Sequence, residues 1–131
     1  MPLIRPAEVK ANMQNEDLII LDIRSQEEFQ VSHLPNARLI SYDDFSPVDL
    51  QSIPKDAEVI VYCSVGYRSE KIGEKMIQQG FTQVKNLYGG IFQWKNEGLE
   101  VVNRNNLATD SVHTYNEKWS KWLTNGIKVY D

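Results

Sequence analysis

Cysteine and histidine are scarce in this chain. Its 131 residues include one cysteine, Cys63, and two histidines, His33 and His113. A single cysteine excludes an internal disulfide, and a tetrahedral zinc site would need carboxylates to complete its ligand set. We therefore expect no metal and no other cofactor, and a fold that depends on its hydrophobic core.

Long hydrophobic runs and excess positive charge are also missing. No segment approaches the length that spans a bilayer. The stretch from Met1 to Lys10 carries charged side chains in place of the apolar run of a signal peptide. The net charge of −4 is spread over interspersed signs and gives no basic patch that would follow phosphates. We therefore expect a cytoplasmic protein that binds neither a membrane nor nucleic acid.

The residues that are present have the balance of an ordinary globular domain. Hydrophobic residues make up 41% of the chain and charged residues 24%. A chain of this length buries roughly two thirds of the surface that its unfolded form exposes, which is enough for one core. Apolar runs alternate with helix-like segments, a pattern typical of a parallel sheet flanked by helices. We predict an α/β fold.

The apolar runs and the turn residues place most of the expected elements. The expected strands are Leu18 to Ile23, Ala37 to Ile40, Val59 to Cys63 and Val84 to Tyr88. The expected helices are Pro6 to Gln14, Ser25 to Gln30, Tyr67 to Gln79 with Gly80 as its C-cap, and a short helix between Gly89-Gly90 and Gly98. Ser25 and Glu28 have the spacing of a capping box, which fixes the start of the second helix.

The last thirty or so residues are interpreted as an extension of a domain that covers residues 1–100. Residues 101–111 are polar and rich in asparagine, so they predict a connecting stretch. Between Val112 and Leu123, large apolar side chains recur at helical spacing and predict a C-terminal helix packed back on the domain; they are Tyr115, Trp119, Trp122 and Leu123. A partner-binding or dimer surface is the alternative. We expect His113 to be an exposed loop residue.

The segment around Cys63 contains the candidate catalytic and binding residues. Cys63 ends a buried strand and stands just before a helix, which is where ligands bind in open α/β sheets. Backbone N–H groups and the positive end of the helix favour a thiolate there. Gly66 allows a positive φ, so that N–H groups can converge on one point, and Arg68 adds a cation suited to an oxyanion such as thiosulfate. A small buried hydrophobe is the alternative role for a lone cysteine.

Three motifs in order resemble the rhodanese family, from about Ile4 to Leu99. They are Leu21-Asp22-Ile23-Arg24 with Glu27-Glu28-Phe29 and His33-Leu34-Pro35-Asn36-Ala37, then Val61-Tyr62-Cys63 with Gly66, Arg68 and Ser69, and then Leu87-Tyr88-Gly89-Gly90-Ile91-Phe92-Gln93-Trp94 with Gly98. The resemblance implies one rhodanese-like domain with a five-stranded parallel sheet. One departure is Ser32, where the family usually places glycine, and this puts the local backbone turn in question.

The resemblance also implies roles for individual residues. Cys63 would be the nucleophile that carries a persulfide. The cradle for the sulfur would be formed by the backbone of Ser64, Val65, Gly66, Tyr67, Arg68 and Ser69. Asp22, Arg24 and His33 match positions that brace the loops around the site, and we expect local ion pairs and turn hydrogen bonds from them.

The implied function is a sulfurtransferase that works through a Cys63 persulfide. The donor would be thiosulfate or a persulfide, and the acceptor a thiol, cyanide or a protein. A cysteine phosphatase is the first alternative, but four residues separate Cys63 from Arg68 here, one fewer than in the phosphatase loop. A non-catalytic or sulfur-carrier rhodanese-like module that serves a protein partner is the second alternative, and fold analogy cannot separate it from an enzyme.

Overall fold

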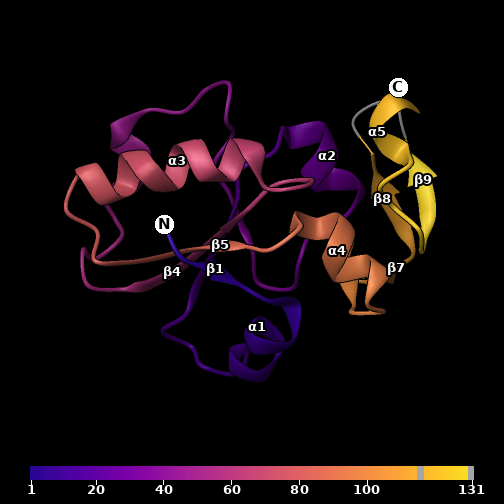
Figure 1. Ribbon diagram of the computed structural model, residues 1–131, viewed down its shortest axis with the longest axis horizontal. Helices are drawn as coiled ribbons and strands as arrows, with labels where there is room; N and C mark the ends of the chain where they lie inside the picture. Colours follow the sequence, from indigo (N-terminus) through magenta and orange to yellow (C-terminus); the bar gives the residue numbers. More distant parts are fainter. Residues whose placement is uncertain (115–116, 130–131) are drawn as a thin grey trace.

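A five-stranded parallel sheet forms the centre of the molecule, in the strand order β1-β5-β4-β2-β3 (Figure 1). The computed structural model describes residues 1–114 and 117–129. The strands are β1 (Leu3–Ile4), β2 (Ile19–Asp22), β3 (Arg38–Leu39), β4 (Glu58–Tyr62) and β5 (Gln83–Leu87). The predicted α/β fold with a five-stranded parallel sheet is confirmed. The short strand β1 had no counterpart among the predicted elements.

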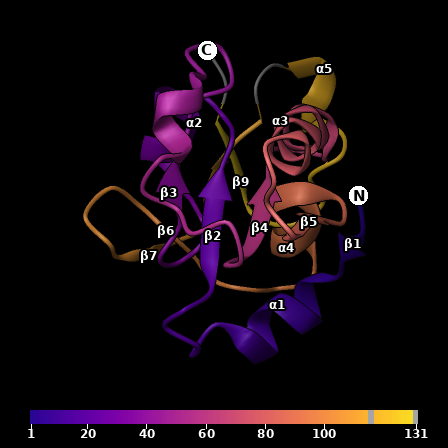
Figure 2. The same ribbon diagram turned by 90° about the vertical axis from the view of Figure 1, so that its left-hand side faces the viewer.

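Helices cover both faces of this sheet. They are α1 (Pro6–Asn12), α2 (Gln26–Val31), α3 (Tyr67–Gln78) and α4 (Gly90–Asn96), with a 3-10 turn, η1 (Pro47–Leu50). Figures 1 and 2 show α1 on one side of the sheet and α3 on the other. One hydrophobic cluster includes Val9 of α1 and Trp94 of α4, and a second includes Ile72 and Met76 of α3. The protein therefore has three layers, with one hydrophobic cluster on each face of the central sheet.

The side chains of the central strands alternate between the two hydrophobic clusters. In β4, Val59 and Val61 belong to the cluster under α3, whereas Ile60 and Tyr62 belong to the cluster under α1 and α4. Successive side chains of a strand point to opposite faces, so a strand covered on both sides must be apolar throughout. This explains why β4 reads as an unbroken hydrophobic run that ends at Cys63.

The C-terminal segment contains far less helix than predicted. Among the described residues of this segment, only α5 (Glu117–Ser120) is helical, and Val112 and His113 belong to a strand. The strands of this segment are β6 (Val101–Val102), which pairs antiparallel with β7 (Ala108–Thr109), and β8 (Ser111–His113), which pairs parallel with β9 (Ile127–Val129). Tyr115, part of the predicted helix, lies outside the described residues.

The predicted exposure of His113 is wrong, because its side chain is only 4% exposed. Its strand, β8, pairs with β9 on one side and contacts α2. A residue enclosed between two elements loses its solvent contact whatever its polarity. The interpretation of residues 101–111 as a connecting stretch missed the β6–β7 pair.

The C-terminal segment packs on the domain through both apolar and polar contacts. Val101, Val112 and Leu123 are at most 1% exposed and belong to the cluster under α1 and α4. The backbones of His33 and Val102 exchange two hydrogen bonds of 2.9 Å each. Figure 1 shows the segment, in yellow, beside α2 and α4. Within the described ranges, no helix combines the length and the apolar character needed to cross a bilayer.

Candidate active site

Cys63 lies directly after β4, and the residue is 1% exposed. Its neighbours are polar as well as apolar. The backbone N–H of Gly66 donates a hydrogen bond to Sγ at 3.1 Å, and the hydroxyl of Ser69 lies 3.4 Å from Sγ. The N–H contact stabilises negative charge on sulfur, and the hydroxyl contact does so when the hydroxyl donates its proton to Sγ. The surroundings of the thiol are therefore those of an anion site.

The loop after Cys63 has the backbone geometry that brings an N–H group onto the sulfur. Gly66 is the N-cap of α3 and has a φ of +119°, in the left-handed region that favours glycine. A side chain at this position would strain the backbone. The twelve-residue helix that follows directs its positive end toward the loop.

Helix α4 fixes the same loop from the other side. The N–H groups of Ile91 and Phe92 donate to the carbonyl oxygens of Cys63 and Ser64, at 2.9 Å and 3.2 Å. Gly90 makes this approach possible, because a Cβ at this position would collide with both of these carbonyl oxygens. The Gly89-Gly90 pair of the sequence therefore serves close packing of α4 against the active-site loop.

Asn86, which the sequence interpretation did not select, completes the polar environment of the sulfur. Its Oδ1 lies 2.6 Å from the Ser69 hydroxyl oxygen, and its Nδ2 donates to the carbonyl oxygen of Gly66 at 3.0 Å. The Ser69 hydroxyl has one proton, and Asn86, the Gly66 carbonyl oxygen and the sulfur all lie within reach of it. Asn86 lies on β5, the strand next to β4. Asn86 reaches the site because β5 lies next to β4, and a contact that depends on the order of the strands leaves no pattern in the local sequence.

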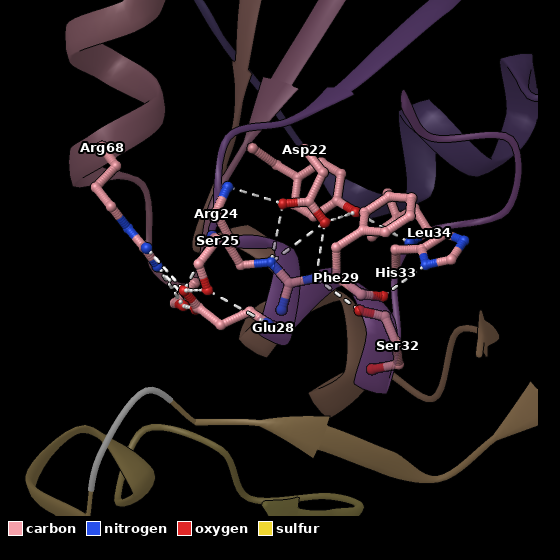
Figure 3. Close-up of polar contacts among 11 residues, drawn as sticks. Asp22, Arg24, Ser25, Glu28, Phe29, Ser32, His33, Leu34 and Arg68 are labelled. Atoms are coloured by element: carbon pink, nitrogen blue, oxygen red, sulfur yellow. Dashed lines mark hydrogen bonds and ion pairs between the residues drawn. The ribbon is translucent and has the colours of Figure 1, made fainter. Parts of the chain in front are cut away.

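Arg68 lies at the start of α3, and its guanidinium forms a two-armed ion pair with Glu28 of α2 (Figure 3). The two nitrogen–oxygen distances are 2.8 Å and 2.9 Å, and Arg68 also donates to the Ser64 hydroxyl at 3.1 Å. Although burial of the Glu28 carboxyl opposes ionisation, Arg68 and Arg24 together lower its pKa from 4.5 to about 2. Burial opposes the charge of Arg68 too, yet Glu28 raises the pKa of Arg68 above its usual value.

The sequence indicated only part of what Glu28 does. The predicted capping box is confirmed: the Ser25 hydroxyl accepts from the Glu28 N–H at 3.3 Å, and the Glu28 carboxylate accepts from the Ser25 N–H at 3.2 Å. The same carboxylate accepts from the Ser64 hydroxyl at 3.2 Å. Glu28 thus joins the start of α2 to the active-site loop, a role that its distance of 40 residues from Arg68 concealed.

We predict that Glu28→Gln is destabilising near neutral pH and that its effect shrinks in acid. A lowered folded-state pKa contributes stability above the unfolded pKa, and this contribution is lost as the pH falls from about 4.5 through about 2. The variant should therefore unfold more easily than the parent by roughly 3 kcal/mol near neutrality. Urea unfolding across this pH range measures the difference. Glu27→Gln, at an exposed position on the same helix, is the control, and equal behaviour of the two variants would contradict the prediction.

Asp22 and Arg24 form a buried ion pair beside the loop, and both side chains are fully buried. Their closest nitrogen and oxygen atoms are 2.7 Å apart, and Arg24 also donates to the carbonyl oxygen of Ser32 at 2.6 Å. The Tyr62 hydroxyl donates to Asp22 at 2.6 Å and accepts from the Leu34 N–H. Burial, followed by the charge of Asp22, raises the pKa of Tyr62 well above 10.0. This network joins β2, β4 and the turn after α2.

His33 and Ser32 lie at the end of this network that faces the C-terminal segment. The His33 ring stacks on Phe29 with its centroid 3.8 Å away, and its Nδ1 lies 2.9 Å from the Phe29 carbonyl oxygen. Ser32 has a φ of −168°, an extended conformation that any residue adopts, so serine fits where the family usually has glycine. In the described part of the chain, its buried hydroxyl has no hydrogen-bond partner.

A cavity of about 250 Å³ opens onto Cys63. It is lined by Tyr42, Asp43, Cys63, Ser64, Val65, Tyr67, Arg68 and Trp119. Four of the predicted cradle residues line this cavity together with Cys63, while Gly66 and Ser69 contact the sulfur directly. Asp22, Arg24 and His33 are not part of the lining. Among the described residues, no group of three or more acidic, histidine or cysteine side chains is placed to hold a metal ion.

Comparisons with known proteins agree with this geometry. A sulfurtransferase from Allochromatium vinosum is 37% identical over 87 residues, which are 66% of this chain and 80% of that protein. A tRNA uridine(34) hydroxylase from Cytophaga hutchinsonii is 35% identical over 70% of this chain, but the match spans only 30% of that protein. The crystal structure of a rhodanese-like domain protein from Staphylococcus aureus is 34% identical, with a TM-score of 0.67, and covers 76% of this chain and 97% of its own.

The family model for the rhodanese-like domain matches residues 5–97. This range includes the strands β2 to β5, the helices α1 to α4 and the whole loop from Cys63 to Ser69, and it stops before β6. The chain therefore belongs to the rhodanese-like domain family.

Proposed function

We propose that this protein is a sulfurtransferase that carries a sulfane sulfur on Cys63 as a persulfide. The observation that carries the proposal is the environment of Sγ, which has a backbone N–H at 3.1 Å and lies at the positive end of α3. These groups stabilise a thiolate, which is the reactive form of cysteine. Membership of the family, and the similarity to a sulfurtransferase over 80% of that protein, support sulfur transfer in general.

The reaction proceeds in two exchanges. In the first, the Cys63 thiolate attacks the outer sulfur of a donor, and the donor's sulfur–sulfur bond breaks as the new bond forms. Thiosulfate leaves as sulfite, and a persulfide leaves as a thiol. In the second, the thiolate of an acceptor attacks the outer sulfur of Cys63–S–S⁻ and restores the Cys63 thiolate. Each exchange is a nucleophilic displacement at sulfur, and covalent storage divides the transfer into two easier steps.

The loop supports both exchanges by stabilising charge. The Gly66 N–H faces the thiolate before the reaction and the persulfide after it. Arg68 is held beside Ser64 by its ion pair with Glu28, so its position does not depend on a bound substrate. A sulfur-carrier module would use the same first exchange and would differ in having a protein as the acceptor. A phosphatase would hydrolyse phosphate esters instead.

Intact-mass measurement after incubation with a sulfur donor tests the proposal. We expect the protein to gain the mass of one sulfur atom when it is given thiosulfate or an organic persulfide, and to lose it on treatment with cyanide or a thiol. Release of thiocyanate in the cyanide arm accounts for the sulfur. Failure to gain sulfur from every donor, or hydrolysis of a simple phosphate ester, would contradict the proposed function.

A further inference from the structure

The charges around Cys63 are balanced in a way that does not favour an inorganic dianion. Arg68 is the only cation that lines the described part of the cavity, and Glu28 neutralises it through two short contacts. Asp43, on the rim, and the Cys63 thiolate both add negative charge. The Gly66 N–H is already directed at the sulfur. A doubly charged donor such as thiosulfate therefore meets little excess positive charge from these side chains.

The walls of the cavity are apolar and aromatic instead. Tyr42 and Trp119, together with Val65 and Tyr67 of the loop, make up half of the residues that line it. Trp119 is the contribution of α5, from beyond residue 97, where the family match ends. It is half-buried and packs against the hydrophobic cluster under α1 and α4. Leu123, at 1% exposure, anchors the same segment four residues later. An aromatic ring held in this way presents a fixed apolar face to a substrate.

A second cavity, of about 410 Å³, shares two of its walls with the first. Val65 and Trp119 line both, and the second cavity extends over Phe92 of α4 and Trp122. Of the two tryptophans in this segment, Trp119 therefore faces the space in front of Cys63, whereas Trp122 lines only the more distant cavity and is 56% exposed. Substituting each tryptophan in turn therefore compares a ring that lines the cavity at Cys63 with a ring that does not.

Building on the proposed sulfurtransferase function, we propose that the donor is an organic persulfide with an apolar group, R–S–SH, and that Trp119 is a specificity-determining residue that contacts R. The step is balanced. The Cys63 thiolate attacks the outer sulfur of R–S–SH, and the sulfur–sulfur bond of the donor breaks. The proton passes to the departing thiolate, giving Cys63–S–S⁻ and R–SH. No oxidant or reductant is consumed. The aromatic wall selects R, because contact with an apolar group replaces water on both surfaces.

The rate at which Cys63 gains sulfur, measured by intact mass with benzyl persulfide, methyl persulfide and thiosulfate, tests this inference. Because each variant is compared with the parent for the same donor, the intrinsic reactivity of the donors cancels. We expect Trp119→Ala to slow loading from benzyl persulfide about tenfold and to leave methyl persulfide and thiosulfate within about twofold. Trp119→Leu, which keeps apolar bulk on α5, should lose roughly threefold with benzyl persulfide alone.

Trp122→Ala is the matched control and should leave all three rates unchanged. Thermal unfolding of each variant shows whether the fold is kept. If Trp119→Ala and Trp119→Leu slow the three donors equally, Trp119 has a structural role only, and the inference is overturned while the proposed function stands. If neither Trp119 variant slows loading from benzyl persulfide, the inference is likewise overturned. If no donor loads the parent, the proposed function fails and the inference fails with it.

Discussion

Cys63→Ser should abolish the gain of sulfur and lower turnover with any donor by at least about a thousandfold. The substitution changes one atom in a site that is otherwise kept, since a serine oxygen accepts a hydrogen bond from the Gly66 N–H as sulfur does. A serine hydroxyl is a much weaker nucleophile than a cysteine sulfur, and it has no sulfur with which to form a persulfide. The variant therefore loses the nucleophile and keeps the pocket. Intact mass measures the gain of sulfur, and a turnover assay measures the rate of transfer.

The composition of the chain makes this experiment unusually clear. Cys63 is the only cysteine, so sulfur gained by the parent protein is held at that position, and the variant has no thiol to react elsewhere. Circular dichroism of the variant checks that the fold is kept. Turnover within about tenfold of the parent would show that sulfur transfer does not pass through a Cys63 persulfide. Gain of sulfur without turnover in the parent would identify a carrier that lacks its protein acceptor in the assay.

Asp22→Ala should lower the free energy of unfolding by about 3–5 kcal/mol. Asp22 is fully buried and accepts hydrogen bonds from Arg24 and from the Tyr62 hydroxyl. Its removal leaves the guanidinium of Arg24 without its counter-ion in a place where water does not reach. Burial opposes the charge of Arg24, and Asp22 offsets that cost and raises the pKa of Arg24 further. Urea unfolding monitored by tryptophan fluorescence measures the loss.

Two controls separate the buried charge from the general effect of shortening an aspartate. Asp17→Ala, at an exposed position before β2, should change the free energy of unfolding by less than about 0.5 kcal/mol. Tyr62→Phe removes one hydroxyl from the same network and should cost about 1–3 kcal/mol, because Asp22 and the Leu34 N–H each lose a partner. A loss below about 1 kcal/mol for Asp22→Ala would show that the ion pair contributes little to stability.

The sheet was predictable because its strands are covered on both faces. Runs such as Ile19 to Asp22 and Glu58 to Tyr62 are nearly all apolar in the sequence, and the structure buries them. The start of α2 was predictable for a different reason, since its capping box is a local interaction between Ser25 and Glu28. The two residues of β1 gave too short a pattern to be recognised.

The candidate site was predictable as far as it is continuous in sequence. The loop from Cys63 to Ser69 contains residue types that indicate a binding loop, but the groups that hold it in place come from distant parts of the sequence. Asn86 is 17 residues from Ser69, and Glu28 is 40 residues from Arg68. Such contacts depend on strand order and on the position of α2 over the loop, which no local pattern contains. This is why Arg68 was interpreted as a partner for an oxyanion, and why its ion pair was missed.

The C-terminal segment shows how tertiary contacts override a helical pattern. Trp119, Trp122 and Leu123 do occur at helical spacing, but the helix ends at Ser120. Val112 and His113 pair with Lys128 and Val129 in a parallel ribbon instead. Apolar residues at intervals of three and four can also be supplied by a strand, a short helix and a loop that converge on one core.

The attachment of the active-site loop to α4 has a consequence for the energy of the reaction. The carbonyl groups of Cys63 and Ser64 are held by the first N–H groups of α4, and Gly90 leaves no room for the loop to shift toward that helix. The dipoles that face the reacting sulfur are thus set before any substrate arrives. In the proposed transfer, little reorganisation is needed as charge moves along three sulfur atoms in line, so that preorganisation of the protein rather than its movement would lower the barrier.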